Sequence, residues 1–82
     1  MDGLSIDKMT ALKNALAKMK NEGVSVPDML GWIYDLGQES ILSEEQEEEL
    51  YCFVDPYDEY NEAPHDYWYE WIGENPLAKY VK

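Results

Sequence analysis

Residues 43–54 read SEEQEEELYCFV, and this stretch decides the fold because it predicts a helix together with its buried and exposed sides. Ser43 is followed three residues later by Gln46, which is a capping-box pattern: each of the two side chains satisfies a backbone N–H at the start of a helix. At about 100° per residue, three apolar residues fall on one side of this helix. We expect that side to face the core, and its residues are Leu50, Phe53 and Val54.

The opposite side of the same predicted helix is acidic. Five glutamates lie within residues 44–49, interrupted only by Gln46, and they spread over roughly 200° of the helix surface. Glu44 and Glu45 favour the positive end of the helix dipole. The run also places like charges at i,i+3 and i,i+4, and each such pair opposes the helix by about 0.2–0.5 kcal/mol. Tyr51 and Cys52 fall within or beside this acidic arc.

A first helix is predicted near the start of the chain. Ser5 is its expected N-cap and Asp7 lies in its first turn, where the dipole favours an acid. Gly23 ends it, because glycine readily adopts the left-handed conformation that follows a helix. The apolar stripe recurs at spacings of three and four residues, at Met9, Leu12, Leu16 and Met19.

A second, shorter helix is predicted between these two. It begins at Pro27 or Asp28, with Ser25 or Val26 just outside, and we expect Gly37 to close it. Its buried stripe consists of Met29, Leu30, Ile33 and Leu36.

Beyond the helix of residues 43–54, the Asp55-Pro56 pair breaks the pattern and residues 56–64, PYDEYNEAP, predict a loop. Pro64 opens a fourth helix or, alternatively, a strand, because aromatic residues favour both. The tail NPLAKYVK predicts a last helical turn. The predicted fold is mainly α: one domain of residues 1–82, built as a small bundle of three to four short helices with an acidic, aromatic-rich loop.

The charge of the chain is concentrated in one segment. The 82 residues carry 18 acids, 6 lysines and no arginine, for a formal net charge of −12. Residues 1–43 are close to neutral, with six acids and four lysines, and predict a helical scaffold. Residues 44–74 hold twelve acids, no base and eight aromatic residues, and predict an acidic-aromatic face. Residues 75–82 form the tail.

This charge excludes some partners and favours others. Nucleic acids and anionic membranes carry the same sign, so direct binding to either is not expected, and a basic protein partner is. A single cysteine allows no intrachain disulfide, which favours a reducing compartment, the cytoplasm. No signal peptide and no apolar run of membrane-spanning length are predicted.

Motifs for catalysis or cofactor binding are not found. Cys52 and His65 are a conceivable nucleophile and base, but carboxylates around a thiol oppose its ionisation. An EF-hand starting at Asp55 fails because tyrosine stands at its third and sixth positions, and one Cys with one His is too few for a structural zinc site. We therefore expect no enzyme activity, no catalytic residues, no metal site and no cofactor.

The resulting hypothesis is a nucleic-acid mimic that occupies the basic nucleic-acid-binding surface of a target protein. The chain is similar in size, charge and aromatic content to small phage and mobile-element proteins that block restriction enzymes, CRISPR effectors or uracil-DNA glycosylase. That resemblance implies an inhibitor acting in the host cytoplasm. One alternative is an acidic adaptor or regulatory module, in which only residues 1–43 are ordered. Another is an antitoxin-like partner that neutralises a basic toxin. The predicted contact residues are Glu44, Glu45, Glu48, Asp55, Tyr57, Asp58, Glu59, Tyr60, Glu62 and Asp66.

Overall fold

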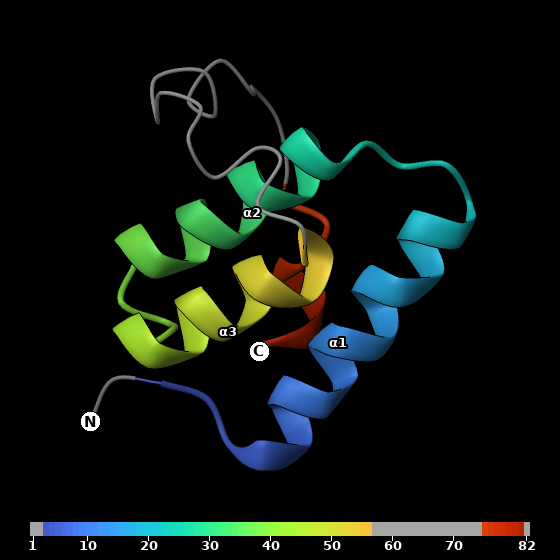
Figure 1. Ribbon diagram of the computed structural model, residues 1–82. Helices are drawn as coiled ribbons and strands as arrows, with labels where there is room; N and C mark the ends of the chain where they lie inside the picture. Colours follow the sequence, from blue (N-terminus) through green and yellow to red (C-terminus); the bar gives the residue numbers. More distant parts are fainter. Residues whose placement is uncertain (1–2, 57–74, 82) are drawn as a thin grey trace.

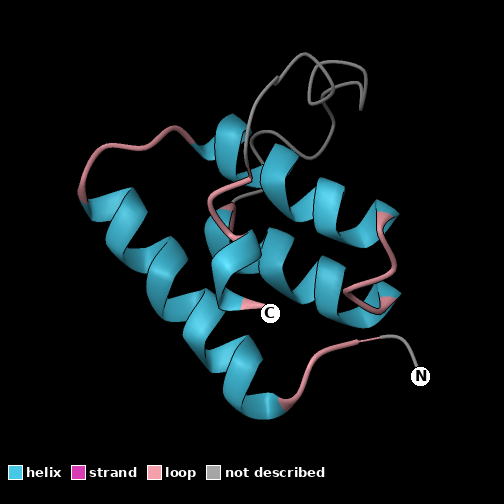
Figure 2. Ribbon diagram, turned by 180° about the vertical axis from the view of Figure 1, so that it is seen from behind, coloured by secondary structure: helices cyan, strands magenta, loops and turns pink. Residues whose placement is uncertain are grey.

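The computed structural model describes residues 3–56 and 75–81, and within these ranges the protein is helical and contains no strand (Figure 2). The elements are α1 (Ile6–Asn21), α2 (Val26–Gln38), α3 (Glu44–Val54) and a 3-10 helix, η1 (Ala78–Tyr80). α2 and α3 run side by side in opposite directions, and α1 packs across α3 (Figure 1). The predicted small helical bundle is confirmed. None of the described helices has the length and apolar character needed to cross a membrane.

The core lies where the apolar stripes of the three helices meet. Every stripe residue predicted for α2 is buried, as are all those predicted for α1 except the half-buried Met19. α3 contributes Leu50 and Val54, and the tail contributes Leu77, which is 0% exposed. Complete burial of such a side chain stabilises the fold by about 1.5–3 kcal/mol. The folded unit therefore includes residues on both sides of the charge boundary at residue 44.

Phe53 is a correction to the predicted core, because its side chain is 41% exposed. The buried arc of α3 is centred between Leu50 and Val54 and extends toward the half-buried Glu47. Phe53 lies about 60° from Leu50 on the other side of that arc, so it falls at the edge of the core.

Serine caps each of the three α-helices. The hydroxyl of Ser5 accepts a hydrogen bond from the backbone N–H of Lys8, and that of Ser25 accepts one from Asp28. Each bond satisfies one backbone donor that the first helical turn leaves without a carbonyl partner. α2 begins at Val26, directly after its cap and one residue before the predicted start at Pro27.

The C-terminus of α2 differs from the prediction that Gly37 closes it. The helix continues to Gln38, and the left-handed residue after it is Ser40, with φ of 61°. The Ile41 N–H donates to the Leu36 carbonyl at 3.1 Å, as expected for a helix that ends at this point. Gly37 lies inside α2, where a Cβ atom would overlap the Glu47 carboxylate, so the glycine leaves room for this side chain of α3.

The tail is anchored to α2 by Asn75. Its side-chain Nδ2 donates to the Trp32 carbonyl at 2.9 Å and to Asp35 Oδ2 at 3.0 Å, and Leu77 then enters the core. The predicted last helical turn is confirmed as η1. The predicted loop beyond Pro56 and the predicted fourth helix or strand lie outside the described residues.

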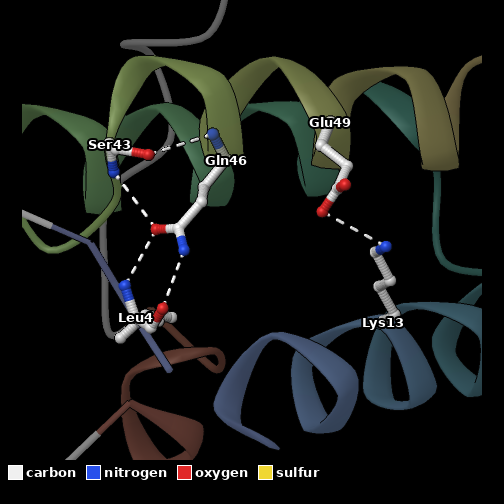
Figure 3. A network of polar contacts seen from close by, with 5 residues as sticks. All are labelled: Leu4, Lys13, Ser43, Gln46 and Glu49. Carbon is white, nitrogen blue, oxygen red and sulfur yellow. Dashed lines mark hydrogen bonds and ion pairs between the residues drawn. The ribbon is translucent and has the colours of Figure 1, made fainter. Parts of the chain in front are cut away.

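The capping box of α3 also holds the beginning of the chain. The Oε1 atom of Gln46 accepts from the Ser43 N–H at 3.3 Å and from the Leu4 N–H at 2.8 Å (Figure 3). Its Nε2 donates to the Leu4 carbonyl at 2.8 Å. One carboxamide therefore caps α3 and joins it to the segment that leads into α1.

This double role predicts the effect of Gln46→Ala. The substitution removes half of the capping box and both bonds to Leu4, so we expect a loss of about 2 kcal/mol in the free energy of unfolding. Ser43→Ala removes only the cap and should lose about 1 kcal/mol. Urea unfolding followed by circular dichroism measures both. Equal losses in the two variants would show that the Leu4 contact adds nothing.

The left-handed Ser40 predicts a stabilising substitution. Because a non-glycine residue at positive φ is strained, we expect Ser40→Gly to raise the free energy of unfolding by about 0.5–1 kcal/mol. Glu39→Gly is the matched control, since Glu39 has φ of −84° and gains nothing from glycine. Thermal unfolding compares the two variants, and a destabilised Ser40→Gly protein would contradict the assigned helix end.

Candidate interaction surface

Three carboxylates form an exposed surface on α3, which we call the acidic face: Glu44, Glu45 and Glu48. Glu48 lies one helical turn from both others, at i+4 from Glu44 and i+3 from Glu45. No hydrogen bond or ion pair within residues 3–56 and 75–81 engages any of the three side chains. These are the three α3 glutamates predicted as contacts, and the structure leaves all of them open to solvent.

The remaining two glutamates of the run are engaged in the fold. Glu47 is half-buried, accepts a hydrogen bond from the Tyr51 hydroxyl and lies against Gly37 of α2. Glu49 pairs with Lys13 of α1, with 3.2 Å between Nζ and Oε2 (Figure 3). The continuous acidic arc expected from the sequence therefore divides into an open part and a part that serves packing.

Local helix physics accounts for some of the open charge and not for the rest. Glu44 and Glu45 lie in the first turn of α3, where the helix dipole favours acids. Glu48 lies beyond the first turn and has like charges at i−4 and i−3, which oppose the helix. Among the five glutamates, Glu48 alone has neither the helix dipole nor a contact within the described residues to stabilise its carboxylate.

Asp55 was predicted as a contact residue, and the structure corrects this. The residue is the C-cap of α3, directly after the buried Val54, and it is 5% exposed. A carboxylate at this depth does not present itself to a partner, so Asp55 is removed from the contact set. The other predicted contacts, Tyr57, Asp58, Glu59, Tyr60, Glu62 and Asp66, lie outside the described residues.

Cys52 lies on the exposed side of α3, between the directions of Glu45 and Glu48, and its thiol is exposed. His65, the only conceivable base for it, lies outside the described residues. Within residues 3–56 and 75–81, no three His, Cys, Asp or Glu side chains come together in a way that would hold a metal ion. Within the described residues, this surface therefore offers a partner mainly exposed carboxylates.

A groove between α1 and α3 adjoins the acidic face, and sequence reasoning did not find it. Its volume is about 320 Å³, and it is lined by Ile6, Met9, Thr10, Lys13, Glu45, Gln46 and Glu49. Ile6 is 85% exposed beside it. The groove depends on how two helices distant in sequence pack together. No signal in the sequence indicates it: Ile6 stands three residues before Met9, at the spacing of the α1 stripe, and only the structure shows that it is exposed.

Comparisons with family models, with curated proteins and with solved structures gave no match for this chain. Its function is therefore argued from its own residues.

The open position of Glu48 predicts that reversing its charge stabilises the protein. Glu48→Lys removes two repulsive pairs and places a lysine four residues after Glu44, the favourable order for a helical ion pair. We expect the free energy of unfolding to rise by about 0.5–1 kcal/mol in low salt. Glu49→Lys is the matched control: it also removes a repulsive pair, with Glu45, but it loses the Lys13 pair and should gain less stability. A loss of stability in Glu48→Lys would mean that this carboxylate serves the fold.

Proposed function

We propose that this chain is an inhibitor that presents its acidic face to the basic nucleic-acid-binding surface of a target protein and excludes the nucleic acid. The target class is a restriction enzyme, a CRISPR effector or a similar defence protein, which places the inhibitor in the cytoplasm of a phage host. The chain acts by binding and needs no catalytic residue or cofactor for this.

The observation that carries the proposal is the open carboxylate of Glu48 with Glu44 and Glu45 beside it. Two lysines of the neighbouring α1 are directed to Glu49 and to the backbone at Val54, and neither forms an ion pair with the acidic face. Solubility needs a net charge of only about 2–8 on a small domain, whereas this chain carries −12. Neither stability nor solubility requires the mutually repelling carboxylates of the acidic face. Selection for binding a partner would account for their presence.

The spacing of the charges suits a surface that binds phosphates. Carboxylates on successive helical turns lie about 5.4 Å apart along the helix axis, and each DNA strand carries one phosphate per about 3.4 Å of the duplex axis. Glu44, Glu45 and Glu48 give three charges within about one turn, a density of the same order as a nucleic-acid strand. A groove of Arg and Lys side chains that binds a nucleic-acid strand can therefore bind this row of three carboxylates. Because both sets of charges are exposed, salt screens much of the attraction between them.

The adaptor alternative keeps the basic partner and drops the mimicry. Its expectation that only residues 1–43 are ordered does not hold for the described residues, because Leu50, Val54 and Leu77 lie in the core. Trp68 and Trp71, whose protection would distinguish the alternatives further, lie outside the described residues. Mimicry and adaptor binding also differ in a second testable property, competition with nucleic acid.

Charge reversal on the acidic face tests the proposal. We expect Glu45→Lys/Glu48→Lys to retain the fold and to lose at least about tenfold in affinity for the target, the magnitude expected when close cross-interface charge pairs are broken. The matched control is Glu22→Lys/Glu39→Lys, which changes net charge equally at two exposed residues that follow α1 and α2. Cations are favoured at those helix ends, so the control should fold.

The measurement is affinity capture from native host lysate, followed by titration of the captured protein at increasing salt. We expect the wild type and the control to capture a nucleic-acid-binding protein that DNA or RNA displaces, with affinity falling steeply as salt rises. Undiminished capture by the acidic-face variant would refute the proposal. A captured partner that nucleic acid does not displace would favour the adaptor.

A further inference from the structure

The groove between α1 and α3 has an apolar side and an acidic side, and a long side chain with a cationic head matches both. Met9 forms an apolar floor and Ile6 an exposed apolar edge, both from α1. α3 supplies the carboxylates of Glu45 and Glu49 on the other side. A volume of about 320 Å³ is at the lower end of the range for ligand sites, which suits a side chain better than a large cofactor.

A cation already occupies part of this groove. Lys13 lines it, and its ammonium group lies 3.2 Å from Glu49, with 35% and 55% of the two side chains exposed. An ion pair this exposed contributes at most about 1 kcal/mol, so a better cation can displace it. Glu45 lines the same groove and takes part in no described ion pair.

We propose that this groove is a subsite for one arginine side chain of the basic partner. The guanidinium binds Glu45 and displaces Lys13 from Glu49, while the aliphatic stem packs on Ile6 and Met9. Arginine fits better than lysine because its planar head binds carboxylates in a two-pronged geometry, and its stem tolerates an apolar surface. The inference rests on the proposed function, since it specifies how part of the target's basic surface is held.

The test uses the full chain and a blocked hexa-arginine peptide, followed by amide chemical shifts in heteronuclear NMR. We expect the peptide to shift Ile6, Thr10 and Gln46 and to bind more tightly than a blocked hexa-lysine peptide. Glu45→Gln should weaken hexa-arginine binding about fivefold, as expected for loss of one two-pronged ion pair. Glu48→Gln removes the same charge from the same helix outside the groove and should weaken it less than about twofold.

Removing the resident lysine gives a second, opposite effect. Lys13→Gln should tighten hexa-arginine binding more than Lys18→Gln, which changes net charge equally on an exposed part of α1 away from the groove. A merely structural role of Lys13 predicts no such gain.

Three results would overturn the subsite: equal losses in Glu45→Gln and Glu48→Gln, shifts that avoid the groove, or no binding of hexa-arginine at all. Each of these leaves the proposed inhibition to be decided by charge reversal and target capture. The opposite combination is also informative. If hexa-arginine binds the groove but the charge-reversed variant still captures the target, the inhibition is refuted and the arginine site is retained. The two failures are therefore distinguishable.

Discussion

The carboxamide of Gln46 joins the beginning of the chain to the beginning of α3, and the position of the acidic face depends on this contact. It accepts hydrogen bonds from the N–H groups of Leu4 and Ser43 and donates one to the Leu4 carbonyl. A carboxylate at this position would accept but not donate, and it would face a carbonyl oxygen. This explains why a run of glutamates is interrupted here by glutamine. Gln46 holds Leu4 against α3 and also lines the groove between α1 and α3, together with Ile6 and Glu45.

The packing of α3 divides its glutamates by the direction in which each side chain leaves the helix. The side toward α2 places Glu47 against Gly37, and the side toward α1 places Glu49 against Lys13. Both contacts join helices and serve the fold. Glu44 and Glu48 are exposed away from both neighbours, and Glu45 is exposed at the groove toward α1. A short helix with one buried side therefore also carries a dense charge.

Local sequence patterns predicted most of the helices because the determinants were themselves local. Serine caps and apolar spacing act within a turn or two, and they placed α1 and α3 correctly. The prediction failed where two helices meet: Gly37 suggested a helix end, but its missing Cβ accommodates Glu47 from α3, and Ser40 takes the left-handed position instead. On α3, the helical period predicted one exposed side that holds all five glutamates, of which Glu44, Glu45 and Glu48 are open in the structure. It could not indicate the pairing of Glu49 with Lys13, 36 residues earlier in the chain, or the burial of Asp55, because both depend on tertiary packing.

The lysines of α1 explain how the C-terminal end of α3 is stabilised although α3 itself carries no basic residue. α3 has no basic residue in its last turn, where the negative end of the helix dipole favours a cation. Lys20 of α1 supplies it from outside, since its Nζ donates to the Val54 carbonyl at 3.3 Å. Lys13 similarly supplies the partner for Glu49 from α1. Because the stabilising cations stand on the neighbouring helix, no lysine has to interrupt the surface of α3. Moving such a cation onto α3, as in Glu48→Lys, would favour the helix and reduce the charge of the acidic face, so stability and the proposed binding place opposite demands on this one position.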